Sequence, residues 1–163
     1  MSTPAELEEK FWKALHSDMT MMLGIPGLDG GHLRPMTAQL DDGHAGPIWF
    51  FTSTDNALVQ ALTSDSHAVA SFVAKGYDLF ASLQGSLTLE TSRAVIDRLW
   101  NHFVAAWYEG GKADPKLALL RFDPARGEVW LSGSSLVAGI KMVMGVDPKR
   151  DYKDKVAKID MRH

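Results

Sequence analysis

The sequence predicts an α+β fold in which roughly six or seven short strands form an antiparallel β-barrel. Two observations favour this class. Short apolar runs alternate with turns that contain glycine or proline, which is typical of strands joined as hairpins. Helical patterns occur only at the start, the middle and the end of the chain, whereas a doubly wound parallel sheet needs a helix after nearly every strand.

Composition restricts the chain to a few classes of protein. With 163 residues it is long enough for one domain with a sizeable core. The formal net charge is −3 and both signs are interspersed, which argues against a nucleic-acid-binding surface. Because there is no cysteine, disulfides, thiol nucleophiles and thiolate metal sites are excluded. The N-terminus lacks the apolar stretch of a signal peptide and no segment has the roughly 18 apolar residues that cross a bilayer, so we expect a cytoplasmic protein with no membrane partner.

The first predicted element is a helix that begins at a capping box. Thr3 is the N-cap, Pro4 occupies the first helical position and Glu6 completes the box, so the pattern predicts a helix through about His16. Residues 19–25 are a short apolar run that is stopped by glycine and proline, which predicts a buried strand.

Two antiparallel pairs of strands are predicted next. Residues 33–40 and 47–52 flank a loop rich in aspartate and glycine and are expected to form a hairpin. Residues 54–56 offer caps for a short helix. Residues 69–74 and 79–89 are expected to form the second pair.

The clearest helical pattern follows Thr91, which we expect to cap a helix. We interpret its apolar stripe as a core or interface face rather than a ligand cage. The stripe consists of Ile96, Leu99, Trp100, Phe103, Val104 and Trp107. Residues 117–122 and 128–131 are predicted strands on either side of a turn at 123–127.

The chain is expected to divide into a domain at residues 1–146 and a charged tail at residues 147–163. Residues 136–146 are apolar and suit a helix despite Gly139. The tail is mixed in sign, which is typical of a solvated segment or of an arm over a partner.

No motif identifies a catalytic or metal-binding residue. The six histidines show no metal-ligand spacing. A nucleophile elbow, a phosphate-binding loop and a dinucleotide fingerprint are all missing from the sequence. Asp41 and Asp42 are interpreted as turn formers. We therefore expect no metal site and assign no catalytic residue.

Polar residues at two strand ends form the remaining candidate site. Arg34 opens one strand, next to a proline that the first residues of a strand tolerate. Thr52 and Ser53 close the strand that is expected to pair with it, so the three side chains are expected to lie close together. They suit an anionic ligand, but Arg34 equally fits a solvated charge at a strand end, and both interpretations remain open.

Two segments at these strand ends resemble those of a known family. Residues 33–37 (LRPMT) and 48–53 (IWFFTS) resemble the FMN-binding split-barrel proteins related to pyridoxamine 5'-phosphate oxidase, and more narrowly their bacterial general stress protein branch. The resemblance covers roughly residues 5–145. Further similar segments are 99–103, 106–112, 117–122 and 128–130.

The resemblance implies a six-stranded antiparallel split β-barrel with flanking helices, usually a homodimer that binds FMN at the subunit interface. It implies that Arg34 lies near the flavin phosphate and that the partner subunit's Trp130 approaches the cofactor. The cofactor-binding residues that it implies are Arg34, Pro35, Met36, Thr37, Phe51, Thr52, Ser53 and Trp130.

One position departs from the family pattern. Relatives commonly carry a lysine, sometimes preceded by arginine, in the helix after the second of these strands, where this chain has Ala57 and Leu58. Loss of a cation at a phosphate costs about 1.5–3 kcal/mol, which is roughly ten- to hundredfold in affinity. Lys141 or the basic residues of the tail are candidates to compensate.

Three hypotheses for function follow. The chain is an FMN-dependent oxidoreductase of unknown substrate, a non-catalytic FMN-binding protein that acts in stress response, or a split barrel that has lost tight FMN binding and serves as a binding or interaction module. Pyridoxamine phosphate is not expected as a substrate, because no second basic cluster is available for its phosphate.

Overall fold

The computed structural model describes residues 3–41, 45–62, 66–131 and 156–162. The helices are α1 (Pro4–Asp18), α2 (Ala57–Ala61), α3 (Arg93–Leu99) and α4 (His102–Ala105), with a 3-10 turn at Gly111–Ala113. The strands are β1 (Thr20–Gly24), β2 (Arg34–Thr37), β3 (Gln39–Leu40), β4 (Ile48–Ser53), β5 (Ser66–Val73), β6 (Leu79–Glu90), β7 (Leu117–Leu131) and β8 (Val156–Asp160).

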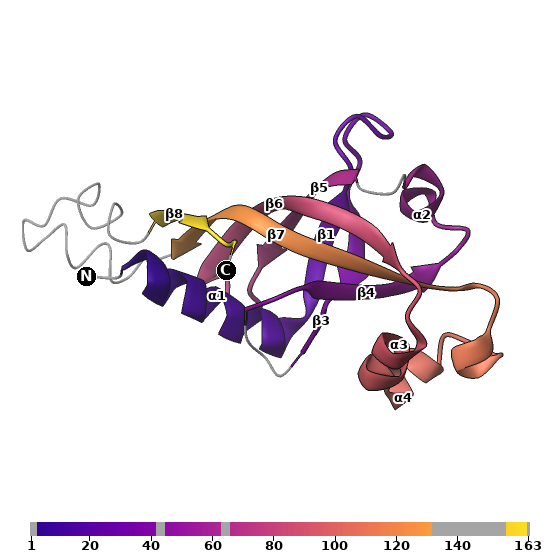
Figure 1. Cartoon of the computed structure of the whole chain (residues 1–163). Helices are drawn as coiled ribbons and strands as arrows, with labels where there is room; N and C mark the ends of the chain where they lie inside the picture. Colours follow the sequence, from indigo (N-terminus) through magenta and orange to yellow (C-terminus); the bar gives the residue numbers. More distant parts are fainter. Residues whose placement is uncertain (1–2, 42–44, 63–65, 132–155, 163) are drawn as a thin grey trace, which may run out of the picture.

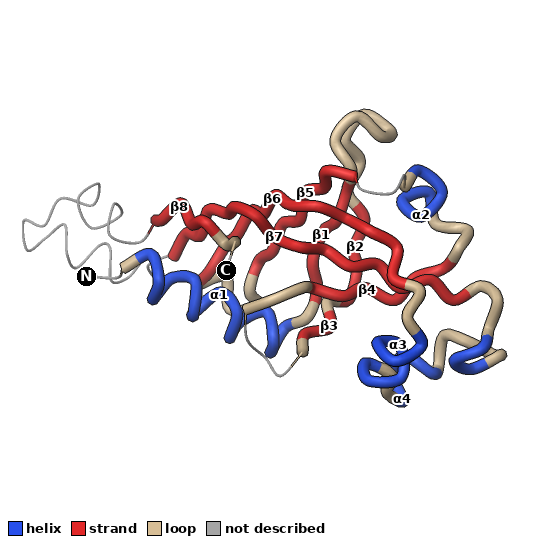
Figure 2. Tube along the Cα trace, in the orientation of Figure 1, coloured by secondary structure: helices blue, strands red, loops and turns tan. Residues whose placement is uncertain are grey.

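The strands form one antiparallel sheet that curls into a nearly closed barrel, flanked by the helices (Figures 1 and 2). The strand order is β2-β1-β5-β6-β7-β4-β3, and β8 pairs with β7 outside this order. The predicted α+β antiparallel barrel is therefore confirmed. It has eight strands in the described part of the chain, rather than the six or seven that the sequence predicts.

Helix α1 begins at the predicted capping box. The Glu6 N–H donates to Thr3 Oγ1 (3.2 Å) and the Thr3 N–H donates to Glu6 Oε2 (2.8 Å). Its apolar face, which includes the fully buried Leu7 and Phe11, joins the core, and the helix contacts β6, β7 and β8. Figure 1 shows α1 and β8 at one end of the barrel and α3 and α4 at the other.

The hairpin predicted between residues 33–40 and 47–52 is wrong for most of its length. β2 pairs with β1, so that Arg34 lies opposite Leu23, and only the short β3 pairs with β4. The chain changes partner at Ala38, which is buried and donates its N–H to the carbonyl of Met19 (2.5 Å). Because β2 and β3 lie at opposite ends of the strand order, this crossing brings the two edges of the sheet together.

The turn predicted at residues 123–127 is also wrong, because β7 is one continuous strand with a bulge. Gly85 of β6 lies opposite Pro124, whereas Gln84 lies opposite Arg126, so Ala125 is the extra residue. A side chain at position 85 would collide with the carbonyl of Asp123, which explains the glycine. Proline is tolerated within the strand because a bulge needs no donor there.

The long helix predicted after Thr91 is divided into two short ones. Ser92 rather than Thr91 is the N-cap of α3, and α4 has its own N-cap at Asn101, whose side chain accepts a hydrogen bond from the Val104 N–H (3.0 Å). An asparagine in this role starts a new helix rather than continuing the old one. The break turns part of the predicted apolar stripe outward, so Phe103 is 72% exposed.

The end of the chain adds a strand that its mixed charge does not predict. Within the predicted tail, Val156–Asp160 form β8, which lies opposite Arg126 to Trp130 of β7. The predicted helix at 136–146, Lys141 and residues 147–155 lie outside the described residues.

Candidate functional site

A pocket of about 430 Å³ lies between β2, the end of β4 and the segment around α4. It contains six of the eight predicted cofactor-binding residues. The lining consists of Pro35, Met36, Thr37, Gln39, Phe51, Thr52, Ser53, Phe103, Val104, Trp107 and Tyr108. The two motifs that carry the family resemblance therefore meet, although β2 and β4 contact each other without pairing.

Tyr108 fixes the position of the pocket wall. Its hydroxyl donates a hydrogen bond to the carbonyl of Thr52 (2.6 Å), which joins the segment after α4 to the end of β4. Burial, with a smaller effect of Asp114, raises the pKa of Tyr108 to about 12. The hydroxyl therefore stays protonated near neutral pH and remains a donor.

The aromatic ring of Trp100 supports the same wall from behind. It packs edge-on against Phe51, with ring centroids 6.0 Å apart, and it is tilted against Tyr108 at 5.9 Å. Edge-to-face and tilted contacts at these separations are favourable arrangements for aromatic rings. The break between α3 and α4 at Trp100 and Asn101 thus gives Trp100 a role in the pocket.

The start of α2 places an apolar residue, and not a cation, at one of the two positions where the resemblance leads one to expect a basic residue. Asn56 caps α2 by accepting a hydrogen bond from the Leu58 N–H (2.9 Å), and its amide donates to Thr52 Oγ1 (3.0 Å). Leu58 is fully buried in the main core. A side chain at this position fills the barrel interior, where a lysine would be an unpaired buried charge.

Phe103 and Trp107 form the outer wall of the pocket, and the sequence alone does not predict this role. They are 72% and 86% exposed, although both line the cavity. Isolated exposed apolar residues are ordinary, but two large aromatics at one cavity mark a contact surface. Asn101 is the residue from which this role could have been predicted, because an N-cap there ends the continuous helix before Phe103 and Trp107.

The described lining carries no charged side chain, and Arg34 lies beside the pocket rather than in its wall. Arg34 Nη2 bonds Asp29 Oδ2 (2.9 Å), and the side chain is 24% exposed. Nη1 is buried and has no hydrogen-bond partner within the described part of the chain. A planar ring system suits the uncharged pocket, and an oxyanion suits the unpaired guanidinium nitrogen.

Trp130 is not brought to this pocket by the fold of one chain. It lies on β7 opposite Phe80 and Val156. It lines another cavity of about 580 Å³, whose wall also includes Gln84, Arg126, Glu128, Lys158 and Arg162. The two remaining predicted residues, Arg34 and Trp130, are thus outside the pocket lining.

Metal sites and membrane-spanning helices are both absent from the described ranges. No group of three histidine, aspartate or glutamate side chains there is arranged to hold a metal ion. No helix in those ranges is long and apolar enough to cross a membrane.

Solved structures resemble this one over most of its length. A general stress FMN/FAD binding protein from Xanthomonas citri is 58% identical, with a TM-score of 0.77 over 80% of this chain and 92% of that one. A protein from Xanthomonas campestris pv. campestris assigned to the general stress family is 59% identical, with a TM-score of 0.79 over 83% and 93% of the two chains. A protein from Jannaschia sp. CCS1 assigned as general stress protein 26 is 31% identical, with a TM-score of 0.80 over 97% and 99%.

Sequence comparison gives two further matches. Protein bli-3 of Neurospora crassa is 24% identical over an alignment of 101 residues that covers 57% of this chain. The matched part spans 48% of that protein, so this chain corresponds to about half of its length. Residues 6–152 match the family described as pyridoxamine 5'-phosphate oxidase like. The chain belongs to the pyridoxamine 5'-phosphate oxidase-like family, and its solved relatives group it with the general stress proteins.

Proposed function

We propose that this protein is a general stress protein that binds FMN in the pocket between β2, β4 and α4. One observation carries the proposal: residues 35–37 and 51–53, which come from the two motifs of the family resemblance, line a single uncharged pocket with aromatic walls. The relative from Xanthomonas citri, named an FMN/FAD binding protein, supports a flavin as the ligand.

The ring system of the flavin is proposed to lie among the aromatic side chains. Phe51 and Tyr108 form the inner wall and Trp107 the outer wall, so a planar ligand would gain stacking and edge contacts on both sides. A bound flavin supplies redox chemistry, whereas these side chains bind and orient the ring and exclude water from it.

Arg34 is proposed to bind the flavin phosphate. Asp29 holds one end of its guanidinium, which leaves Nη1 buried and unpaired in the described structure. An arginine fixed in this way loses little side-chain freedom when an oxyanion binds. Because Ala57 and Leu58 offer no cation, Arg34 is the main charge proposed for this contact.

A homodimer is proposed to complete the site. The exposed faces of Phe103 and Trp107 would be covered by a second copy, and the partner subunit's Trp130 would contact the flavin. The exposure of two large aromatics at the pocket supports this arrangement.

A second candidate function is a split barrel without tight FMN binding, which acts as a binding or interaction module. The uncharged lining and the burial of Leu58 favour this alternative, because the ordinary cation for a phosphate is replaced by a core residue. Within the first candidate, catalysis and flavin storage stay open, since no acid or base lines the described pocket.

Visible absorption and FMN fluorescence test the proposal. The purified protein is expected to be yellow or to quench the fluorescence of added FMN with one flavin per chain. A colourless protein that leaves FMN fluorescence unchanged would contradict it and favour the second candidate. If flavin binds, photoreduction followed by mixing with oxygen and candidate acceptors separates an oxidoreductase from a storage protein.

A further inference from the structure

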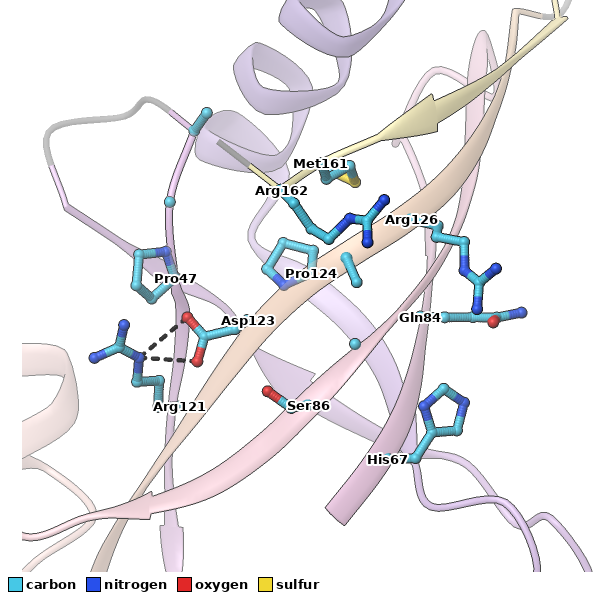
Figure 3. Close-up of a pocket in the computed structure, with 14 residues that line it drawn as sticks. Pro47, His67, Gln84, Ser86, Arg121, Asp123, Pro124, Arg126, Met161 and Arg162 are labelled. Carbon is cyan, nitrogen blue, oxygen red and sulfur yellow. Dashed lines mark hydrogen bonds and ion pairs between the residues drawn. The ribbon is translucent and has the colours of Figure 1, made fainter. Parts of the chain in front are cut away.

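A larger groove, distinct from the pocket proposed for FMN, lies across β5, β6 and β7, and Figure 3 shows the residues that line it. Its volume is about 740 Å³, and it is formed by the segment before β4, by β5, β6 and β7, and by the end of the chain after β8. The lining consists of Ala45, Gly46, Pro47, His67, Gln84, Gly85, Ser86, Arg121, Asp123, Pro124, Ala125, Arg126, Met161 and Arg162. None of these residues lines the pocket proposed for FMN, so the two cavities are separate. We call the larger cavity the Arg126 groove.

The bulge in β7 places Arg126 in this groove. Before the bulge, the buried residues of β7 include Phe122 and Pro124, at even positions; after it, Val129 is buried, at an odd position. The extra residue, Ala125, therefore shifts the alternation by one. Without it Arg126 would face the core, so the bulge directs the guanidinium into the groove, as bulges near binding sites commonly do.

The other two arginines of the groove neutralise the nearby carboxylates. Both oxygens of Asp123 accept hydrogen bonds from Arg121 Nε, at 3.1 and 3.0 Å. Asp160 accepts from Arg162 Nε (2.8 Å) and Nη2 (2.6 Å). Arg126 has no hydrogen bond or ion pair within the described ranges. It is therefore the arginine of the groove that makes no ion pair in the described structure, and Asp160 lies directly opposite it in the pairing of β7 with β8.

Polar side chains from the two neighbouring strands also line the groove. Gln84 lies directly opposite Arg126 in the pairing of β6 with β7. Ser86 lies two residues further along β6 and directly opposite His67 of β5. Figure 3 shows the side chains of Gln84 and His67 on the same side of the sheet as Arg126. An amide, a hydroxyl and an imidazole near a free guanidinium suit an anion with several acceptor oxygens.

We propose that the Arg126 groove is a second small-molecule site, which binds a phosphorylated metabolite through Arg126. Arg126 takes the phosphate in a bidentate contact, which its planar fork allows. Arg162 contributes its Nη1, which Asp160 leaves free. The volume exceeds that of one phosphate and lies in the usual range for pockets that hold small organic ligands. None of its residues lines the pocket proposed for FMN, although Gln84, Arg126 and Arg162 also line the cavity that Trp130 borders.

Calorimetric titration of the full chain with inorganic pyrophosphate tests the proposal, at low ionic strength where screening is weak. One pyrophosphate per chain is expected to bind. Arg126→Gln is expected to weaken binding about tenfold, the loss of one charge-assisted contact. Arg126 is exposed and unpaired in the described structure, so this variant is expected to fold normally. Gln84→Ala, on the neighbouring strand, is expected to weaken binding about threefold.

Arg98→Gln is the matched control, since it removes the same charge from an exposed arginine that lies outside the groove, paired with Asp41. It is expected to bind pyrophosphate like the natural protein. Absence of binding to the natural protein, or equal weakening by Arg126→Gln and Arg98→Gln, would overturn the proposal. Displacement of pyrophosphate by FMN would also overturn it, because it would place the anion in the flavin pocket. A protein that binds pyrophosphate but not FMN would contradict only the proposed flavin function.

Discussion

Arg34 is the residue at which a phosphate-binding role and an ordinary surface role can be separated by experiment. One of its guanidinium nitrogens is held by Asp29, and another is buried without a described partner. A surface charge would instead be solvated on all sides. The side chain is therefore restrained by Asp29, and the strand that carries it pairs with β1 and not, as the sequence suggested, with β4.

Replacement of Arg34 by alanine is predicted to weaken FMN about tenfold, because one charge-assisted contact is lost. Riboflavin, which has no phosphate, is expected to bind the variant and the natural protein equally. Fluorescence titrations with both flavins measure the two effects. Arg98→Ala is the control and should change neither affinity. If riboflavin and FMN weaken together, Arg34 supports the pocket structurally and does not bind the phosphate.

Tyr108 is predicted to make the free energy of unfolding decrease as the pH becomes alkaline. Its pKa is about 12 in the folded chain and 10.0 in the reference state, because burial disfavours the phenolate. Tyr108 therefore stays protonated to a higher pH in the folded state than in the unfolded state. Its contribution to the free energy of unfolding is complete below pH 10 and is lost as the pH rises to about 12.

Thermal unfolding of Tyr108→Phe across this range tests the prediction. At neutral pH the variant is expected to be less stable by about 1 kcal/mol, because the hydrogen bond to Thr52 is lost. The difference from the natural protein should narrow between pH 10 and 12. Tyr77→Phe, at a 72% exposed position, is the control and should show no such change. A constant difference for Tyr108→Phe would contradict the assignment.

Among the elements, the bulge of β7 determines the register that places Arg126 in the Arg126 groove. It depends on Gly85, where a Cβ atom would meet the backbone of Asp123 and Pro124. We predict that Gly85→Ala destabilises the fold by about 2–3 kcal/mol, the range for overpacking that the backbone cannot relieve easily. Denaturant unfolding measures this change. Gly76→Ala is the control, because its added Cβ would make only ordinary contacts with Asp78, from 3.4 Å. Equal effects of the two variants would contradict the role given to the bulge.

The elements that the sequence predicts well are those specified by nearby residues. Helix α1 follows from the capping box of Thr3 and Glu6, and β5 and β6 follow from the alternation of apolar residues. The crossing at Ala38 and the bulge at Ala125 depend on partners far along the chain, so local patterns do not reveal them. Strand β8 also depends on a distant partner. It forms by pairing with β7, and its charged sequence does not indicate this pairing.

At the scale of the whole molecule, the barrel assembles the candidate site from segments that local rules keep apart. The family motifs identified six lining residues, including Thr37 and Ser53. Phe103 and Trp107 were not assigned to the site, because the helical periodicity was interpreted as a core or interface face and the break at Asn101 leaves both side chains exposed at the pocket. The Arg126 groove could not be predicted, since it needs the bulge register and the end of the chain after β8.

The central claim, that flavin binds between β2, β4 and α4, is tested most directly by a pair of serine substitutions. Ser53 lines the proposed flavin pocket and Ser86 lines the Arg126 groove. A tryptophan at either position would fill its own cavity and leave the other unchanged. In an FMN fluorescence titration, we predict one flavin per chain for the natural protein and for Ser86→Trp, and a loss of roughly a hundredfold or more in affinity, about 2.7 kcal/mol, for Ser53→Trp. No quenching by the natural protein, or unchanged binding by Ser53→Trp, would contradict the account.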